Sequence, residues 1–385
     1  MTSAHVGGTV DPRFEPVRDA FVRNFDEHGE IGAAVCIRVG GRVVADLWGG
    51  HADAAGRRRE WTGDTLVNAF SVGKGMVALL FAQLVGDGAV NVDSRVADVW
   101  PEFAAAGKQD VTIRQVLSHQ AGLPALRQRM QPDSMLDWHT MTAALAAEKP
   151  WWEPGTRHGY HVNTFGFLAG EVIRRVTGRS VGTVLRERVA GPLGADVHLG
   201  LAPEADDRVA DFLWPFDPPP EEEPPGLEGF ELMRHNAYWN PSGLSGAGVI
   251  NTDAWRRAEM PSTNLHASAR GVATVYAALA AGGTLDGVRV VDPAALAAAT
   301  VEQVDGDDLV LGRPSRFALG FQLTQPERPL GPNPGAYGHF GAGGSLGFCD
   351  PQAGVAFGYV MNELGARWQN PRNSALIDAL YASLG

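Results

Sequence analysis

Strand-forming segments lie near both ends of this 385-residue chain, and a long stretch of helical patterns separates them. Residues 33–39 and 42–48 are two apolar runs joined by Gly40-Gly41, which predicts a β-hairpin. Residues 345–350 and 355–361 are two further strand-like runs, with glycine and proline between them. This order predicts one antiparallel sheet assembled from both ends of the chain, in a fold of the α/β class and of α+β type.

Helices are expected beside these strands and throughout the middle of the chain. Apolar residues at helical spacing predict helices over residues 14–28, 71–85, 164–177 and 372–384. We therefore expect residues 1–385 to form a single unit with two lobes, namely a sheet lobe flanked by helices and a mostly helical second lobe. Residues 1–70 and 285–385 are assigned to the sheet lobe and residues 71–284 to the helical lobe. The cleft between two such lobes is the expected site.

Residues 202–248 differ in composition from the rest of the expected helical lobe. Residues 215–225 read PFDPPPEEEPP, which is too stiff and too acidic for a packed helix or strand. We expect this region to form an ordered excursion or a lid over the cleft.

Composition and charge narrow the classes of partner and compartment. The formal net charge of −12 repels phosphate backbones and anionic lipid heads, which argues against nucleic acid and membrane surfaces as partners. Residues 1–12 lack the apolar core of a secretory signal, and the longest apolar run, residues 76–85, is half the length of a bilayer span. Cys36 and Cys349 both lie in strand-like runs and are expected to be buried free thiols. These features predict a soluble, cytoplasmic protein.

The most informative short motif is Ser71-Val72-Gly73-Lys74, at the start of an expected helix. One helical turn places Lys74 on the same face as Ser71, so its amine can reach the Ser71 hydroxyl. A serine hydroxyl needs such a base to become a nucleophile, and the helix N-terminus supplies N–H groups that stabilise developing negative charge. The alternative is a surface lysine whose ammonium reaches solvent. The chain carries its other cations almost wholly on arginine, which cannot act as a base, so a lysine here favours the chemical role.

A second serine motif, Gly343-Gly344-Ser345-Leu346-Gly347, matches the nucleophile elbow of α/β-hydrolases. That fold requires a histidine after the serine, and the last histidine of this chain is His339. We therefore interpret the segment as a glycine-rich strand edge. No metal-ligand or phosphate-loop pattern stands out, so no metal and no cofactor are expected.

Three ordered motifs resemble class C β-lactamases, and more closely their esterase relatives, the family VIII carboxylesterases. The motifs are Ser71-Val72-Gly73-Lys74, the segment Trp152-Glu153-Pro154-Gly155 leading to Tyr160, and His339-Phe340-Gly341. Two supporting phrases also resemble that family, residues 117–123 (LSHQAGL) and 164–166 (TFG). The resemblance spans nearly the whole chain and implies a β-lactamase-like catalytic unit that forms an acyl-enzyme on Ser71.

The resemblance also implies roles for other residues. Lys74 and Tyr160 would form the general base, and a phenol beside an ammonium is expected to have a lowered pKa. The backbone N–H groups of Ser71 and Ala342 would form the oxyanion hole. The third motif, with His339 and Gly341, would line the substrate site. The alternatives are a loop aromatic for Tyr160, packed on Trp151 or Trp152, and a strand-end histidine without function for His339.

Two departures from the class C pattern shape the expected substrate. The second motif there is Tyr-x-Asn, whereas this chain has Val162 at that position and Asn163 one residue later. Asn163 could still reach the substrate if its loop were shifted. His339 stands where β-lactamases commonly have lysine, which weakens attraction of a substrate carboxylate. Both departures favour small to medium neutral carboxylic esters as the small-molecule substrate.

Other activities use the same machinery. A β-lactamase or a D-amino-acid amidase would act on amides, and an acyltransferase would pass the acyl group to an alcohol or amine. A binding protein on a degenerate scaffold is the non-enzymatic alternative, and the joint presence of Ser71, Lys74 and Tyr160 argues against it. Acyl chain length, the physiological substrate and oligomeric state do not follow from the sequence.

Overall fold

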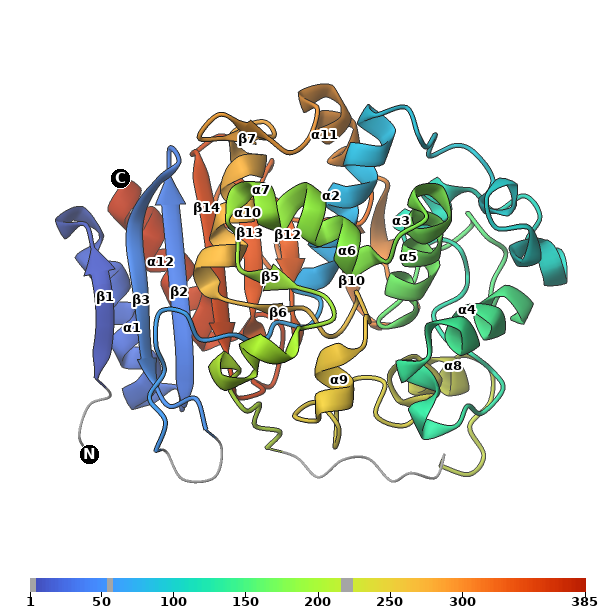
Figure 1. The fold of residues 1–385 in the computed structure, drawn as a ribbon, viewed down its shortest axis with the longest axis horizontal. Coiled ribbons are helices and arrows are strands. Elements are labelled where there is room, and N and C mark those ends of the chain that lie inside the picture. The colour runs from blue at the N-terminus through green and yellow to red at the C-terminus, as the bar shows by residue number, and fades with distance from the viewer. Residues whose placement is uncertain (1–4, 54–57, 216–223) are drawn as a thin grey trace.

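The computed structural model describes residues 5–53, 58–215 and 224–385. Its largest element is a nine-stranded antiparallel sheet with the order β1-β3-β2-β14-β13-β12-β11-β10-β9 (Figure 1). The N-terminal strands are β1 (Val6–Val10), β2 (Gly32–Val39) and β3 (Arg42–Gly50). They join the C-terminal strands where β2 pairs with β14 (Val355–Met361). The expectation that both ends of the chain build one antiparallel sheet is confirmed.

The other strands are short. The large sheet also contains β9 (Val304–Asp307), β10 (Pro314–Phe317), β11 (Gln322–Leu323), β12 (Tyr337–Phe340) and β13 (Leu346–Asp350). A small sheet has the order β4-β6-β5, formed by Val67–Asn68, His266–Ala267 and Val197–His198, and a hairpin joins β7 (Thr284–Leu285) to β8 (Val288–Arg289). Strands such as β9, which reads VDGD, carry too few apolar residues to show a strand pattern, and the sequence analysis did not predict them.

Helices cover both faces of the large sheet. Helices α1 (Glu15–Glu27) and α12 (Pro371–Leu384) pack together on one face, and α10 (Ala269–Ala280) lies across β2, β13 and β14 on the other (Figure 1). Every residue of β13 and β14 is buried, which explains why these strands are uninterrupted apolar runs. Although α10 falls within residues 71–284, it packs on the sheet, so the expected division at residue 285 does not follow the packing.

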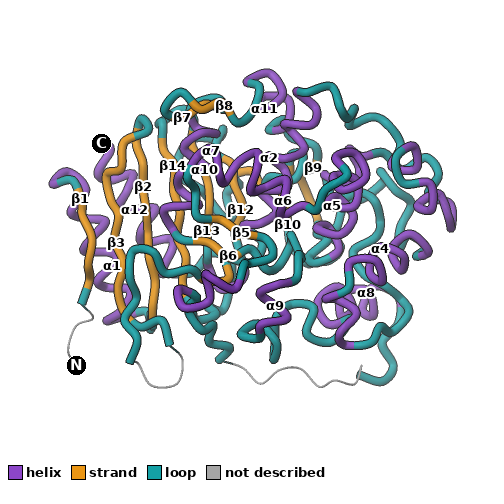
Figure 2. The backbone as a smooth tube through the Cα atoms, viewed as in Figure 1, coloured by secondary structure: helices purple, strands orange, loops and turns teal. Residues whose placement is uncertain are grey.

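Helix α2 (Val72–Gly86) lies between the sheet and the helix-rich part of the molecule (Figure 2). It contacts β12 on one side and α5 and α11 on the other, and twelve of its thirteen residues from Val72 to Leu84 are apolar, glycine or glutamine, the exception being Lys74. The remaining helices are α3 (Ile113–Leu117), α4 (Trp138–Ala147), α5 (Thr164–Thr177), α6 (Val181–Leu185), α7 (Gly191–Leu193), α8 (Gly229–Trp239), α9 (Asp253–Arg257) and α11 (Pro293–Ala299).

Several local expectations can be compared with these bounds. Gly178 ends α5 in the left-handed conformation with φ of 70°, as a C-terminal glycine should. Asn163 holds the N-cap position of α5, and the Thr164 hydroxyl donates to the carbonyl of Leu123. Cys36 and Cys349 are buried free thiols, as predicted.

Part of the expected lid, residues 216–223, lies outside the described residues. Just before it, the amide of Leu213 donates to the carbonyl of Asn362, which ties this segment to the end of β14. Across the described ranges, no helix combines the length and the apolar character needed to cross a bilayer.

Candidate active site

Ser71 is the residue immediately before α2, and the backbone around it is strained. Phe70 adopts a left-handed conformation with φ of 50°, which is costly for a non-glycine residue and is typical of functional sites. Its ring packs edge-on against Phe212 at 4.9 Å. Ser71 retains 8% of its surface exposed, whereas Lys74 and Tyr160 are fully buried. Of these three residues, Ser71 is therefore the one that retains contact with solvent.

The Lys74 amine is enclosed by three oxygen atoms. Its Nζ lies 2.9 Å from Ser71 Oγ, 2.6 Å from the carbonyl of Val162 and 3.1 Å from the carbonyl of Ser262. Burial lowers the pKa of Lys74 well below 10.5, which makes the amine easier to deprotonate. In this geometry Nζ donates to all three oxygens, and the Ser71 hydroxyl donates in turn to the Ser262 carbonyl.

Two glycines allow the Ser262 carbonyl to approach. A side chain at Gly73 in α2 would come within 2.3 Å of the carbonyl of Pro261, and one at Gly166 in α5 would come within 2.6 Å of the Ser262 amide. That close packing lets the Ser262 carbonyl accept hydrogen bonds from both Lys74 and the Ser71 hydroxyl, each at 3.1 Å. Sequence analysis did not identify Ser262, because its backbone rather than its side chain touches the reacting groups.

Tyr160 is held by its backbone and its ring rather than by its hydroxyl. Its amide donates to both carboxylate oxygens of Asp308, at 3.0 Å each. Its ring stacks on Phe317 with an interplanar angle of 3° and meets Trp368 edge-on at 5.0 Å. The hydroxyl is buried, and the Ser71 hydroxyl interacts with it. The Tyr160 hydroxyl is therefore placed beside the reacting group.

The electrostatics of Tyr160 differ from the expectation. Burial raises the pKa of Tyr160 well above 10, and the nearby Ser71 hydroxyl only partly opposes this. The Lys74 amine lies over the face of the tyrosine ring, 4.8 Å from its centre. The expected lowering of the tyrosine pKa is therefore wrong, because burial outweighs any stabilisation of the phenolate. Tyr160 is a neutral phenol in this site.

Two histidines fix the loop that carries Tyr160. His161 Nδ1 donates to the carbonyl of Gly159 and its Nε2 accepts from the amide of Leu123. The His161 amide in turn donates to Nδ1 of His119, a residue in the left-handed conformation with φ of 62°. His119 belongs to the LSHQAGL phrase of the sequence, and its role here is to position the loop from 159 to 161.

Ser345 connects the third motif, through Gly341, to the loop before Ser71. The Ser345 hydroxyl is buried and donates to the carbonyl of Ala69 at 2.9 Å, so it is a structural group and the elbow-like motif is not a second nucleophile. A side chain at Gly341 would come within 2.1 Å of Ser345 Oγ and 2.4 Å of the Ala69 carbonyl. Gly341 thus permits this contact, and its amide is already used by Ser345.

The two amides expected to form the oxyanion hole belong to the segments that Ser345 connects. Ser71 precedes α2, and Ala342 begins the short 3₁₀ helix Ala342–Gly344 after β12. Neither amide donates a hydrogen bond to another described part of the chain. Both donors are therefore available to an oxyanion.

His339 lies in β12, fully buried beside Tyr160, with 6.0 Å between the ring centres. Its Nδ1 is 2.7 Å from the carbonyl of Phe340 and must be the donor in that bond. Burial and the Lys74 amine hold the pKa of His339 well below 6.5, so the ring is neutral and Nε2 carries only a lone pair. His339 therefore cannot donate to a substrate carboxylate as a lysine would.

Asn163 does not take the role of the missing amide-binding asparagine. Its Nδ2 donates to the carbonyl of Ala237 and to the Ser245 hydroxyl, and its Oδ1 accepts from Thr263. The expected substrate contact of Asn163 is thus corrected: its amide joins three surrounding segments and has no donor left for a ligand. The side chain at the motif position is Val162, which is apolar.

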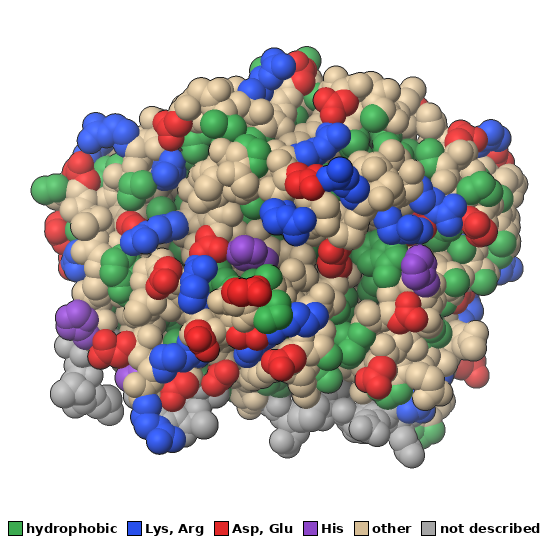
Figure 3. All heavy atoms as spheres, in the orientation of Figure 1, with side chains coloured by type: hydrophobic (Ala, Val, Ile, Leu, Met, Phe, Trp, Pro, Cys, Tyr) green, Lys and Arg blue, Asp and Glu red, His purple; other side chains and the backbone are tan. Residues whose placement is uncertain are grey.

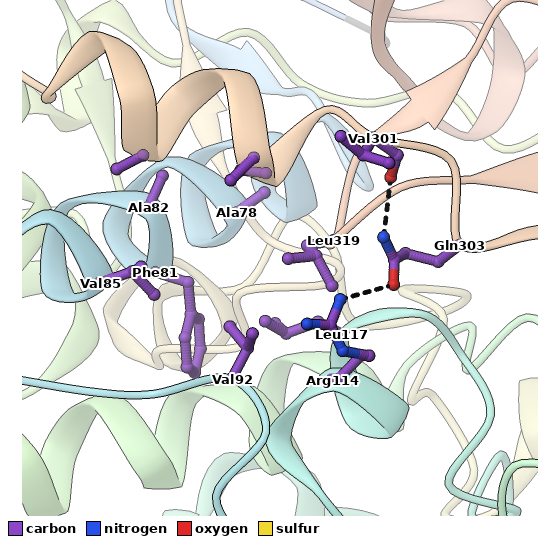
Figure 4. A pocket seen from close by; sticks show the side chains of 13 residues that line it. Ala78, Phe81, Ala82, Val85, Val92, Arg114, Leu117, Val301, Gln303 and Leu319 are labelled. Carbon is purple, nitrogen blue, oxygen red and sulfur yellow. Dashed lines mark hydrogen bonds between the residues drawn. The ribbon is translucent and has the colours of Figure 1, made fainter.

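A separate apolar cavity of about 270 Å³ lies along α2, away from Ser71. It is lined by Ala78, Phe81, Ala82 and Val85, with Arg114 and Gln303 hydrogen-bonded to each other at its edge (Figure 4). Neither Ser71 nor Lys74 lines this cavity. It is therefore not the place where an ester would react.

Three comparisons relate this geometry to known proteins. The sequence pattern of the Beta-lactamase family matches residues 18–382. A crystal structure of a family VIII carboxylesterase is 43% identical, with a TM-score of 0.90, and the match covers 98% of this chain and 100% of that one. A penicillin-binding protein homologue from Caulobacter crescentus is also 43% identical, with a TM-score of 0.91 and the same coverage. The esterase/β-lactamase LipL of Mycobacterium tuberculosis is 35% identical over 372 residues, which are 93% of this chain and 83% of that protein.

Asp308 provides a test of how Tyr160 is positioned. Its carboxylate accepts from the amides of Tyr160, Val310 and Leu311 and from the Ser315 hydroxyl. We expect Asp308→Ala to lower kcat for a p-nitrophenyl ester at least tenfold, because small displacements of reacting groups are costly. The exposed neighbour Asp307 is the control, and Asp307→Asn should leave kcat unchanged. A folded Asp308→Ala variant with full kcat would contradict this role.

Proposed function

Because the chain belongs to the β-lactamase family, we propose that it is a carboxylesterase that hydrolyses small to medium esters through an acyl-enzyme on Ser71. The observation that carries the proposal is the buried Lys74 amine, which lies 2.9 Å from Ser71 Oγ and whose pKa is lowered well below 10.5 by burial. The family relationship supports the chemistry, and the similarity to a family VIII carboxylesterase supports esters as the substrate class.

In the proposed acylation step, Lys74 accepts the Ser71 proton as Oγ attacks the ester carbonyl. The resulting ammonium has three hydrogens, and the carbonyls of Val162 and Ser262 hold two of them. The third returns to the oxygen of the departing alcohol. The amides of Ser71 and Ala342 stabilise the negative charge that develops on the carbonyl oxygen.

Deacylation repeats these steps with water as the nucleophile. Lys74 accepts a proton from the water, which attacks the acyl carbonyl, and returns it to Ser71 Oγ as the carboxylic acid leaves. Tyr160, kept as a neutral phenol by burial, donates a hydrogen bond to the oxygen that enters or leaves. In this scheme Lys74 is the base and Tyr160 assists as a donor.

Replacing the nucleophile gives the first test. We expect Ser71→Ala to reduce kcat by about 10⁴ or more, because removing one member of a concerted set removes most of its catalysis. The other buried serine of a glycine-rich segment, Ser345, is the matched control. Because its hydroxyl only supports Ala69, Ser345→Ala should retain far more activity. Comparable losses in the two variants, or a tenth of wild-type activity in Ser71→Ala, would refute Ser71 as the nucleophile.

The pH profile identifies the base. The lowered pKa of Lys74 predicts that kcat/KM rises with pH as the ammonium loses its proton, with a midpoint well below 10.5. The raised pKa of Tyr160 predicts a plateau that continues past pH 10, since the phenol stays protonated. The profile of Tyr160→Phe should keep the same acid limb at lower activity, and Lys74→Arg should lose it because arginine stays charged. A base formed by tyrosinate would instead give a rise near or above pH 10 that Tyr160→Phe abolishes.

Substrate class can be decided on one preparation. A β-lactam needs a donor for its carboxylate and an amide-binding group, and here His339 Nε2 is only an acceptor while Val162 is apolar. Each missing charged hydrogen bond is worth about 1.5–3 kcal/mol, which predicts a preference of roughly 10²–10⁴ in kcat/KM for p-nitrophenyl butyrate over nitrocefin. Similar values for the two substrates would replace the esterase proposal with a β-lactamase one.

A further inference from the structure

Two arginines pack on Trp368, the residue that meets Tyr160 edge-on. The guanidinium carbon of Arg313 lies 5.0 Å from the Trp368 ring centre and that of Arg328 lies 5.9 Å from it. The Trp368 ring centre is also 5.0 Å from the Tyr160 ring centre, so Trp368 contacts both the tyrosine and the Arg313 guanidinium. Arg367, the residue before Trp368, adds a third positive charge that opposes that of Arg313. We call Arg313, Arg328 and Arg367 the arginine cluster.

The arginine cluster has no ion-pair partner among the described residues. Elsewhere arginines such as Arg174, Arg316 and Arg372 each bind a carboxylate, and one face of the molecule shows both signs of charge interspersed (Figure 3). By contrast, the Arg313 and Arg367 side chains make no hydrogen bond to any residue in the described ranges. Arg328 donates only to neutral acceptors, the carbonyl of Pro314 and the side-chain oxygen of Gln325.

Two carboxylates of the described ranges, those of Asp308 and Glu327, lie near the arginine cluster but do not neutralise it. Asp308 is within electrostatic range of Arg313, but its oxygens are occupied by three amides and the Ser315 hydroxyl. Glu327, near Arg328, is fully exposed to solvent and bonded to Gln325. Burial and the charge of Arg313 lower the pKa of Arg328 to about 10. A bound anion would favour the charged form of these arginines.

The surroundings indicate what kind of anion would reach this place. Trp368, which contacts both Tyr160 and Arg313, belongs with Tyr160 and Val162 to one packed apolar group. The Tyr238 side chain, which packs on the same apolar group, interacts electrostatically with both Tyr160 and Arg313. Arg328 is buried, whereas Arg313 and Trp368 are half-buried and Arg367 is exposed, so a ligand can approach Arg313 and Arg367. A ligand with an apolar chain that ends in an anion would match the apolar group and the arginines next to it.

We propose that the arginine cluster binds a carboxylate that the ester substrate carries at the end remote from its reacting carbonyl. This inference rests on the proposed esterase function and refines the expectation of a neutral ester. Around the reacting carbonyl the site favours uncharged groups, because His339 offers only a lone pair there. At the far end of the chain, Arg313 and its neighbours favour a negative charge, since arginine binds carboxylates through directed, charge-assisted hydrogen bonds.

The test compares esters of equal length with and without the charge. Ethyl esters of monocarboxylic acids are paired with monoethyl esters of dicarboxylic acids of four to eight carbons, and hydrolysis is followed by titration of released acid. A second pair, butyl acetate and 4-acetoxybutyrate, places the carboxylate on the alcohol instead of the acyl group. We expect kcat/KM for at least one charged ester to exceed that of its neutral partner tenfold or more. Added salt should reduce this ratio.

Variants assign the preference to the arginine cluster. Arg313→Gln should lower the charged-to-neutral ratio at least tenfold while kcat/KM for the neutral ester stays within twofold, and Arg313→Lys should restore part of it. Arg316 is the matched control, because it lies on the same strand and pairs with Glu302, so Arg316→Gln should not alter the ratio. An unchanged ratio in both Arg313→Gln and the Arg313→Gln/Arg367→Gln double variant would overturn the proposal. Hydrolysis of the neutral esters, and its loss in Ser71→Ala, tests the esterase function separately.

Discussion

The site depends on the removal of one amine from water. Lys74 is the charged exception in an otherwise uncharged helix, and no carboxylate among the described residues is bonded to it. An isolated ammonium in such a place is disfavoured, so burial favours loss of the proton and makes the amine a better base. Backbone carbonyls accept the hydrogen bonds of this buried amine. They do so without stabilising its positive charge as strongly as a carboxylate would. The segments around residues 160 and 262, together with the glycines that admit them, all serve this arrangement.

The same desolvation separates the roles of the two ionisable groups. Burial disfavours a positive charge on lysine and a negative charge on tyrosine, so it lowers the pKa of Lys74 and raises that of Tyr160. Reasoning from sequence placed an ammonium beside a phenol and predicted a lowered pKa for the phenol. In the structure the amine faces the tyrosine ring, and burial favours the neutral form of both groups. One physical effect thus makes the lysine the better acceptor and the tyrosine the better donor.

Sequence patterns predicted what depends on neighbours along the chain. The hairpin of β2 and β3, the helix after Ser71, the end of α5 at Gly178 and the paired strands β13 and β14 all follow from local periodicity and turn residues. Asp308 and Ser262 could not be found in this way. Asp308 acts through a carboxylate that accepts from the distant backbone amide of Tyr160. Ser262 acts through its backbone carbonyl. Neither role is marked by a residue type or by a spacing in the sequence. The Arg313–Trp368 contact likewise joins segments that are unrelated in sequence.

The pairing of β2 with β14 has a consequence for synthesis on the ribosome. Val35 lies opposite Tyr359, so the central pair of the sheet cannot form until nearly the whole chain has been made. Until then β2 presents an unpaired apolar edge, and the helix that carries the nucleophile lacks its neighbour β12. Contacts so distant along the chain also slow folding, because the entropy of closing a long loop is lost before the stabilising contacts form. A chain that stops before residue 355 therefore lacks the strand that joins its two ends, and it becomes a substrate for chaperones or aggregation rather than a partial enzyme.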